Sequence, residues 1–243
     1  MLAILIALVF TTSFISGVIG MAGGIILMGA LSLSMGILSA MLLHGFTQLS
    51  ANLIRSMLLR KHIQTGVLPY YLIGCIGAFL LLSYLNYYPN KEIVLISIGL
   101  FPFIAIGLPK RWNLDISQRR NGIFAGLLVG SAQIFAGASG PVQDVFFINS
   151  KLNRYEVIAT KSVCQVAGHF LKIIFYGKLL LLSSQEQLEF SPWIMPPILI
   201  ATFAGTKAGK AVLGLLSEQQ FQKYSRIIIA MIGGFYVMKG LPF

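Results

Sequence analysis

Charged residues are scarce in this sequence, and acidic residues are the scarcest of them. Of the 243 residues, 10% are charged and only 7 are Asp or Glu. A soluble domain carries about 25% charged residues, so the composition argues against a water-soluble protein. Apart from Asp144, the acidic residues fall in connectors or at the ends of apolar segments. They form no carboxylate pair for acid–base chemistry, and we expect no enzyme.

Motifs for nucleotides, metals and activated nucleophiles are also missing. The sequence has neither the G-x-x-x-x-G-K-[ST] phosphate loop nor the G-x-S-x-G elbow, and its 3 histidines lack the H-E-x-x-H spacing of zinc enzymes. Cys75 and Cys164 are isolated within apolar segments, which argues against a disulfide framework and favours a packing role. We therefore expect no cofactor and no metal. Uphill transport would have to draw on an ion gradient or on a partner.

Long apolar runs dominate the sequence. Hydrophobic residues make up 56% of the chain, and the mean hydropathy is +0.82. Eight segments are each long enough to cross the ~30 Å hydrocarbon layer of a bilayer. These segments are 2–30, 37–59, 67–86, 92–109, 122–148, 155–182, 192–216 and 224–241. The connectors are short, and Met1–Phe10 lacks the basic region of a secretory signal peptide. The sequence therefore predicts an all-α, multi-pass protein of the inner membrane that retains its N-terminus.

The formal net charge of +11 raises the question of nucleic acid as a partner. The Lys and Arg residues lie at the ends of the apolar segments, where the rules of membrane topology place them. We therefore expect the lipid bilayer, and no nucleic acid, as the partner of these charges.

An internal repeat is visible at a constant spacing. Adding 117 maps Gly20 to Gly137, Gly23 to Gly140, Gln48 to Gln165, Asn52 to His169 and Arg55 to Lys172. Later residues follow with a shift of 131, which takes Gly74 to Gly205 and Ala78 to Gly209. Glycine matches arise easily by chance, but paired polar residues do not. We therefore expect two homologous repeats, 1–118 and 119–243, in one membrane domain, a common organisation of secondary transporters.

The first segment of each repeat is broken by glycines, at Gly20–Gly24 and at Gly137–Pro141. Each is either one broken crossing or a pair of short helices that enters the membrane and returns. The second arrangement, with the N-terminus outside, puts every Lys and Arg on the cytoplasmic side except Lys91, Lys172, Lys178 and Lys239. The first arrangement divides the cations almost evenly. The positive-inside rule therefore favours repeats of inverted topology.

A half-helix that begins at a glycine break points unpaired backbone N–H groups and its positive dipole end at whatever lies in front of it, which suits an anion. Gly23 and Gly24 in the first repeat, and Ser139 and Gly140 in the second, are the candidates. The alternative is that these glycines only allow helices to pack closely. Pro141 fits the first turn of the second half-helix, where a missing N–H costs little.

Polar residues share one face of the next helix in each repeat. The two sets are His44, Gln48, Asn52 and Arg55, and Lys161, Gln165, His169 and Lys172. Their spacing of four, four and three residues places each set on one helix face. Such residues at membrane depth are costly and usually face a cavity or a partner. Alternatively, the amides tie helices together, and Arg55 and Lys172 extend to the headgroups.

Asp144 is the one acidic residue inside an apolar run, and its counterpart in the first repeat is Leu27. A carboxylate at this depth must be paired, protonated or functional. Its candidate partners are Lys161, Lys172 and His169. The sequence leaves open whether Asp144 carries a proton in a coupled cycle or forms a structural ion pair.

The order and spacing of these motifs resemble those of the sulfite exporter TauE/SafE family of bacterial membrane proteins. The matching stretches are Gly17–Gly24, Gly126–Gly130, Gly137–Pro141, Thr160–Gln165, His169–Lys172 and Tyr176–Lys178. The resemblance covers essentially the whole chain and implies a transporter, often an exporter, of small sulfur-containing anions such as sulfite or organosulfonates. Met21 and Ala22 replace a run that is usually richer in glycine, and Asp144 is not expected, so the resemblance leaves the solute and the direction open.

Residues and resemblance together predict a secondary transporter, an exporter as in the family, for a small sulfur-containing anion, which works by alternating access between the repeats. The residues assigned to substrate binding are Gly23, Gly24, Gln48, Asn52, Arg55, Ser139, Gly140, Gln165, His169 and Lys172. A passive anion channel would use the same groups without coupling. A membrane scaffold would use them only to hold helices together. The sequence is also compatible with a homo-oligomer.

Overall fold

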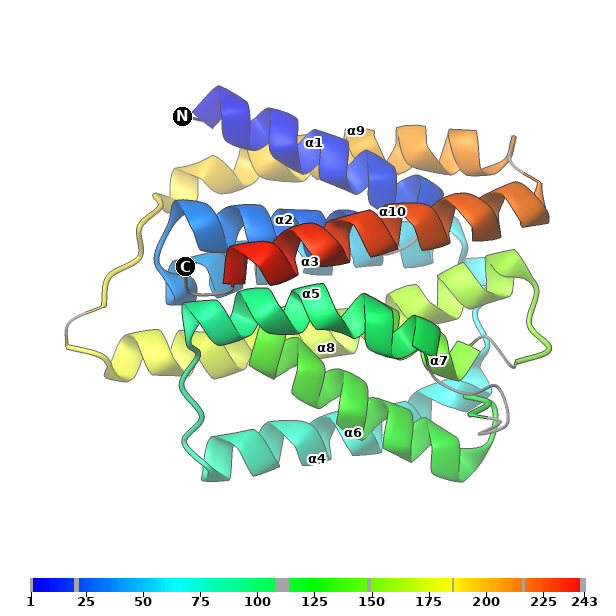
Figure 1. Cartoon of the computed structure of the whole chain (residues 1–243), viewed down its shortest axis with the longest axis horizontal. Helices are drawn as coiled ribbons and strands as arrows, with labels where there is room; N and C mark the ends of the chain where they lie inside the picture. Colours follow the sequence, from blue (N-terminus) through cyan, green and yellow to red (C-terminus); the bar gives the residue numbers. More distant parts are fainter. Residues whose placement is uncertain are drawn as a thin grey trace.

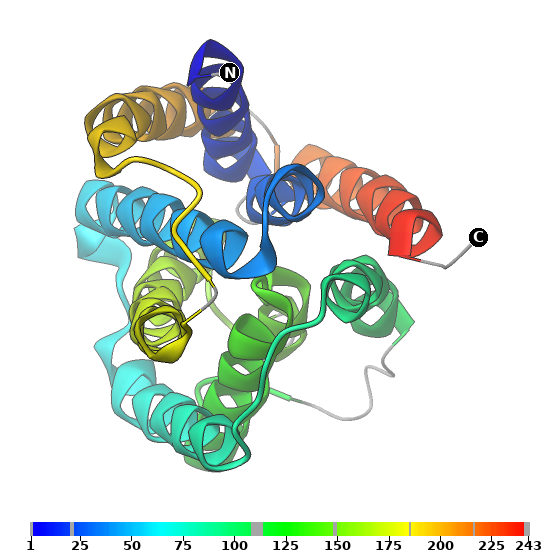
Figure 2. The same ribbon diagram turned by 90° about the vertical axis from the view of Figure 1, so that its left-hand side faces the viewer.

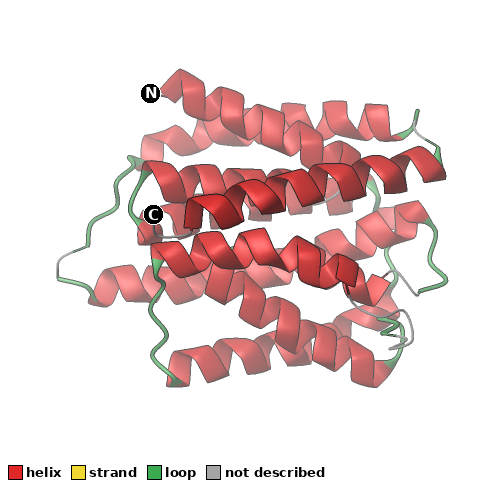
Figure 3. Cartoon of the chain, viewed as in Figure 1, coloured by secondary structure: helices red, strands yellow, loops and turns green. Residues whose placement is uncertain are grey.

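The computed structural model describes residues 2–19, 22–107, 114–147, 150–184, 186–215 and 217–240. Over these residues the chain consists of ten α-helices, three short 3₁₀ turns and connectors, with no strand (Figure 3). Three helical stretches, Ile37–Leu58, Thr65–Tyr84 and Arg154–Leu182, are long and apolar enough to cross a membrane. The prediction of an all-α fold is confirmed.

Both glycine-broken segments consist of two helices. The first holds α1 (Leu2–Ile19) and α2 (Ala22–Ser34), and the second holds α6 (Arg119–Ala136) and α7 (Gly140–Phe147). Gly20 and Met21 lie outside the described residues. In Figure 1, α1 runs inward from the N-terminus and α2 returns beside it, so both ends of this hairpin lie at the same side of the molecule.

The second break depends on one glycine. Gly137 follows α6 with a φ of 76°, in the left-handed region. Its N–H donates to the carbonyl of Gln133 at 3.1 Å. This is a common way to end a helix, and glycine adopts the conformation without a steric penalty from a Cβ. The chain is thereby redirected into α7 only three residues later.

The other helices are close to the predicted segments in their bounds. They are α3 (Ile37–Leu58), α4 (Leu68–Tyr84), α5 (Lys91–Gly107), α8 (Arg154–Leu182), α9 (Met195–Leu213) and α10 (Glu218–Gly240). The start of α8 is fixed by a capping box: the side chain of Asn153 accepts from the N–H groups of Tyr155 and Glu156, and the Glu156 carboxylate accepts from the N–H of Asn153.

The helices associate in four main pairs: α1 with α9, α4 with α6, α3 with α8, and α5 with α10. Seen end-on in Figure 2, α3 and α8 form the middle of the molecule, between the α1–α9 pair and the α4–α6 pair. The α5–α10 pair lies to one side. The largest buried apolar cluster fills the space between α2, α3, α5, α6, α8 and α9. The polar faces of α3 and α8 therefore meet at the centre.

Small residues bring two of these pairs very close together. A methyl group added to Gly74 of α4 would overlap the backbone of Ile123 and Gly126 in α6. One added to Gly205 of α9 would overlap the backbone of Phe10 in α1. Association of helices in lipid relies on this kind of close backbone packing, because burial of apolar surface contributes little there. These two close contacts between helices, the α1–α9 seam and the α4–α6 seam, hold α3 and α8 between them.

Candidate functional site

Lys172 of α8 lies at the centre of the site, fully buried at 0% exposure. Its Nζ donates to Nδ1 of His44 and to the carbonyl of Gly137, both at 2.9 Å. His44 Nε2 lies 2.9 Å from the carbonyl of Gly24. A carbonyl can only accept, so His44 carries its proton on Nε2 and accepts from Lys172 on Nδ1. Lys172 thus contacts the glycine break after α6 directly, and His44 links Lys172 to the start of α2.

The charge of Lys172 is not matched by a carboxylate. Among the described residues there is one ion pair, which joins Lys161 and Asp144. The third nearby group is the sulfur of Met28, at 4.0 Å from Nζ. The partners of this buried lysine are an imidazole, a carbonyl and a thioether, and none of these groups offsets a full charge.

Gln133 of α6 links this centre to the second polar helix. Its Nε2 donates to the carbonyl of Gly137 at 3.0 Å and to Nδ1 of His169 at 2.9 Å. Its Oε1 accepts from the hydroxyl of Ser139 at 2.6 Å. The rings of His169 and His44 lie 5.4 Å apart. Gln133 was not among the residues predicted from the sequence, although a glutamine one helical turn before Gly137 in an apolar run is a usable signal.

The side-chain nitrogen of Gln165 in α8 has two hydrogen-bond partners. Its Nε2 donates to the hydroxyl of Ser139 at 3.2 Å and to Oε1 of Gln143 at 2.7 Å. Gln143, on α7, in turn donates to the backbone carbonyl of Lys161 at 3.5 Å. These bonds fix the start of α7, which begins at Gly140, against α8. Gln143 is a second polar residue of the site that sequence reasoning did not assign.

Gln48 of α3, the residue 117 positions before Gln165, lacks such partners for its Nε2. Its side chain is 4% exposed, and among the described residues its Nε2 has no hydrogen-bond partner. It faces Gly24, where an added methyl group would lie 3.3 Å from its Oε1. Buried polar atoms in native proteins are almost always paired. An unpaired amide donor beside a broken helix and an unmatched lysine therefore indicates a place for an acceptor, such as an anion.

The comparison with protein families decides what kind of protein carries this centre. The family model described as sulfite exporter TauE/SafE matches residues 5–236. The chain belongs to the sulfite exporter TauE/SafE family. No curated protein and no solved structure matches it. Because the family is one of membrane transporters for sulfur-containing anions, and because the helices are apolar, this TauE/SafE chain is a membrane transporter of the exporter type.

The TauE/SafE fold does not bring all of the predicted residues together. Gly23 faces α1, where an added methyl group would overlap the carbonyl of Thr12 and crowd the hydroxyl of Ser16. Its geometry fits the packing alternative. Gly24, one residue later, faces Gln48 and contributes its carbonyl to His44.

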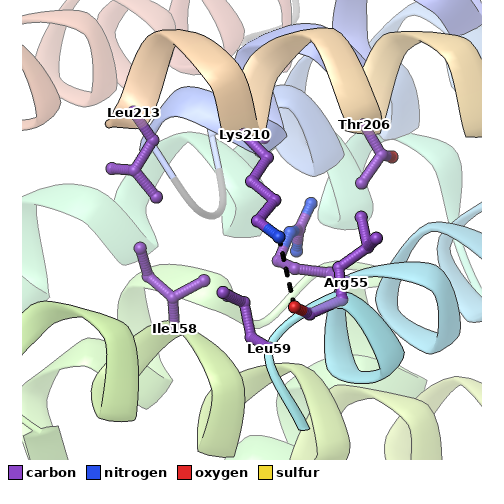
Figure 4. A pocket seen from close by; sticks show the side chains of 8 residues that line it. Arg55, Leu59, Ile158, Thr206, Lys210 and Leu213 are labelled. Atoms are coloured by element: carbon purple, nitrogen blue, oxygen red, sulfur yellow. Dashed lines mark hydrogen bonds between the residues drawn. The ribbon is translucent and has the colours of Figure 1, made fainter. Parts of the chain in front are cut away.

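Arg55 lies far from Lys172. It is 11 residues beyond His44 on α3, which corresponds to about 16 Å along the helix. Its Nη1 donates to Oδ1 of Asn52 at 2.9 Å, and Nδ2 of Asn52 donates to the carbonyl of Gln48 at 2.8 Å. Arg55 lines a separate pocket together with Lys210 (Figure 4). The two cations predicted to act together thus stand at different depths of the transporter.

Asp144 pairs with Lys161, one of its three predicted partners. The Asp144 side chain is 36% exposed and the Lys161 side chain 10% exposed. Asp144 is therefore less deeply buried than its apolar sequence neighbours indicated, because α7 is short and its outer face is only partly covered. Among the described residues, no group of three His, Cys, Asp or Glu side chains could hold a metal ion. Cys75 and Cys164 are buried thiols that form no disulfide.

Proposed function

We propose that this TauE/SafE protein is a secondary transporter that carries a small sulfur oxyanion, sulfite or an organosulfonate, out across the bacterial inner membrane by alternating access. The observation that carries the proposal is the centre formed by Lys172, His44 and Gln48. It combines an unmatched buried cation with an unpaired amide donor between two broken helices. A sulfur oxyanion offers the negative charge and the acceptors that this centre lacks.

We propose further that the two halves are structural repeats. In the α4–α6 and α1–α9 seams, four close contacts correspond. They are Gly74 with Gly126, Ala78 with Gly130, Gly205 with Ser13, and Gly209 with Gly17. A shift of 131 maps α4 onto α9, and a shift of 113 maps the α1 residues onto those of α6. This shift is four residues, or one helical turn, smaller than the shift of 117 that relates the glycine breaks. The stretch from the seam contact to the glycine break is therefore one turn longer in α6 than in α1.

The contacts between α3 and α8 support an inverted relationship between these repeats. His44 contacts Lys172, and Arg55 is close enough to Lys161 for their charges to repel. A shift of 117 takes His44 to Lys161 and Arg55 to Lys172, so one contact maps onto the other with the partners exchanged. This is the pattern of a two-fold axis between antiparallel helices, which lies in the membrane plane in inverted-repeat transporters.

Transport is tested in liposomes that contain the purified protein. We expect saturable flux of labelled sulfite, reduced by one or two of thiosulfate, sulfoacetate and taurine and unaffected by acetate or chloride. The transported anion, at a concentration 100 times its Kd, should also raise the free energy of unfolding of the detergent-purified protein by about 2.7 kcal/mol. Gln48→Leu should remove both effects while the protein stays folded. Unchanged flux in this variant would contradict the assigned site.

The alternatives give different results in the same liposomes. Flux that rises linearly with sulfite and ignores proton and sodium gradients is the behaviour of a passive channel. Absence of flux and of stabilisation for every sulfur anion, in wild-type protein that is folded, would contradict the transport proposal and favour a scaffold.

A further inference from the structure

The connector between α8 and α9 crosses the start of α3 and is bonded to it (Figure 2). The carboxylate of Glu189 accepts from the backbone N–H of Gly36, the N-cap of α3, at 2.9 Å. The backbone N–H of Glu189 donates to the hydroxyl of Ser39 at 3.0 Å, and this hydroxyl donates to the carbonyl of Gln187 at 3.5 Å. In the proposed topology this end of the molecule faces the outside, and we call these contacts the outer latch.

The connector between α3 and α4 is bonded to the start of α8 in a similar way. The backbone N–H of Gln64 donates at 3.0 Å to the hydroxyl of Thr160, which is fully buried. The side chain of Gln64 donates to the Glu156 carboxylate at 2.8 Å. The ring of His62 stacks on that of Tyr155, with the centroids 5.4 Å apart. In the proposed topology this end faces the cytoplasm, and we call these contacts the inner latch.

The two latches are related by the spacing of the proposed repeats. A shift of 117 takes Gly36 to Asn153, the N-cap of α8, and Ser39 to Glu156. In α8 the Glu156 carboxylate accepts from the N–H of Asn153, so the cap is local. In α3 the residue at that place is Ser39, and Glu189 of the other repeat supplies the carboxylate instead. In both latches a connector N–H also donates to a buried hydroxyl on the polar helix of the other repeat.

Each latch joins the two proposed repeats at one end of the central helix pair. α3 and α8 are antiparallel, so the start of each lies beside the end of the other. The Lys172 centre lies between the latches, since His44 is about 12 Å along α3 from Gly36 and Lys172 about 18 Å along α8 from Thr160. Alternating access opens the path to such a centre from one end at a time. The contacts that join the repeats at one end must therefore break when that end opens.

We propose that the outer and inner latches are the two gates of the transport cycle, and that this structure, in which both latches are formed, is the occluded state. The inference rests on the proposed function, because it assigns the contacts that an alternating-access transporter breaks in turn. The gates consist mainly of hydrogen bonds at the ends of helices. Water can replace such bonds at small net cost, so a gate of this kind closes the path without making its opening slow.

Two matched variants remove one buried hydroxyl from each latch. Ser39→Ala removes the acceptor of the Glu189 N–H, and Thr160→Val removes the acceptor of the Gln64 N–H. Loss of one hydrogen bond should raise the population of the state that is open at that end roughly fivefold. Because apparent affinity rises with the fraction of binding-competent protein, T160V should lower the KM for sulfite supplied at the cytoplasmic face by up to about fivefold. S39A should lower the KM at the outer face instead.

These KM values are measured in liposomes in which the protein is inserted in one orientation, with sulfite supplied first to one face and then to the other. A hydroxyl that only stabilises the fold would not produce a change confined to one face. KM values of S39A and T160V that change equally from both faces, or do not change, would overturn the proposal.

Cross-links that hold each latch closed provide a second test, which keeps both hydroxyls and decides the matter if S39A or T160V does not fold. The pairs are Gly36→Cys with Glu189→Cys for the outer latch, and Gln64→Cys with Glu156→Cys for the inner latch. A short bismaleimide joins each pair through thioether bonds, which sulfite does not cleave, and excess reagent is removed. Either cross-link should abolish sulfite flux. Calorimetry should still detect sulfite binding, because the opposite end can open.

The control pair is Gln118→Cys with Asn121→Cys, whose side chains are bonded at the start of α6 within one proposed repeat. Its flux should survive the cross-link, and so should the flux of each single-cysteine variant treated with the same reagent. Loss of sulfite binding in both cross-linked latch pairs, or flux that survives either latch cross-link, would overturn the gates alone. Wild-type protein that moves no sulfur anion would overturn the proposed function, and the gates with it.

Discussion

Gln48 and Gln165, which lie 117 residues apart, have different surroundings, and their replacement should have different effects. Gln165→Leu removes the donor that holds Ser139 and Gln143, so it should destabilise the protein by about 1–3 kcal/mol. Gln48→Leu removes an amide whose Nε2 has no partner among the described residues, so stability should change little. Unfolding of both variants in mixed micelles with increasing SDS measures the difference. Equal losses would contradict the assigned hydrogen bonds.

The two roles considered for Asp144, proton coupling and a structural ion pair, predict different results. Asp144→Asn should destabilise the protein by about 1–3 kcal/mol, less than for a fully buried pair because the carboxylate is 36% exposed. Addition of Lys161→Met should restore stability. If Asp144 carries a proton in the transport cycle, folded D144N loses the response of flux to a pH gradient but still exchanges solute. A retained pH response in D144N would assign Asp144 to structure alone.

Sequence spacing predicted which side chains share a face of one helix. It did not predict the distances between side chains on different helices. The four-four-three spacing led to His169 and Lys172, and the structure places both in one network with Ser139 and Gln165. Contact across helices depends on their direction and register. For that reason the separation of Arg55 from Lys172 could not be predicted. The roles of these residues in binding stay predictions.

At the scale of elements, the glycine break after α6 can be tested directly. Gly137→Ala forces a φ of 76° on an L-residue and brings a methyl group against the sulfurs of Met28 and Met41. The strain alone should cost about 1–2 kcal/mol. Because the Gly137 carbonyl accepts from Lys172 and Gln133, the KM for the anion should rise as well.

Gly177→Ala is a suitable control for this variant. It lies on α8, and an added methyl group would have no atom within 4 Å. This substitution should be neutral or slightly stabilising, since alanine favours the helix. Equal KM values for both variants would contradict a role of the Gly137 carbonyl in binding.

The seams between helices give a second element-scale prediction. Gly74→Ala should weaken the α4–α6 pair by about 1–3 kcal/mol, because the methyl group meets backbone that cannot move aside. Gly77→Ala, less than one turn further along α4, meets only a side-chain atom at 3.9 Å and should have little effect. Thermal unfolding in detergent measures both. A smaller loss for G74A than for G77A would contradict the seam.

The existence and bounds of the helices were the most predictable feature. Apolar length located α3 at 37–59, against the observed Ile37–Leu58, and glycine clusters located both breaks. The pairing of α1 with α9 and of α4 with α6 was not predicted. Such pairing depends on which small residues face each other across long sequence distances, and one sequence does not provide this information.

For the whole molecule, the proposed topology predicts which connectors face which side. Lys61 and Asn90 are exposed residues in connectors at opposite ends of the molecule. In intact cells, a membrane-impermeant maleimide should label Asn90→Cys and not Lys61→Cys, and it should label both after permeabilisation. The native cysteines are buried and should stay unlabelled. Labelling of both variants from the same side would contradict an odd number of crossings between them.

The two seams join the proposed repeats in a crossed manner, since the first helix of each repeat packs on the fourth helix of the other. Neither half can therefore satisfy its own small-residue surfaces. A gene that encoded one half alone would yield a protein that is stable only as a pair of copies inserted in opposite orientations. Two fragments divided between α5 and α6 should likewise assemble into a working transporter when they are produced together, and each should be degraded when produced alone.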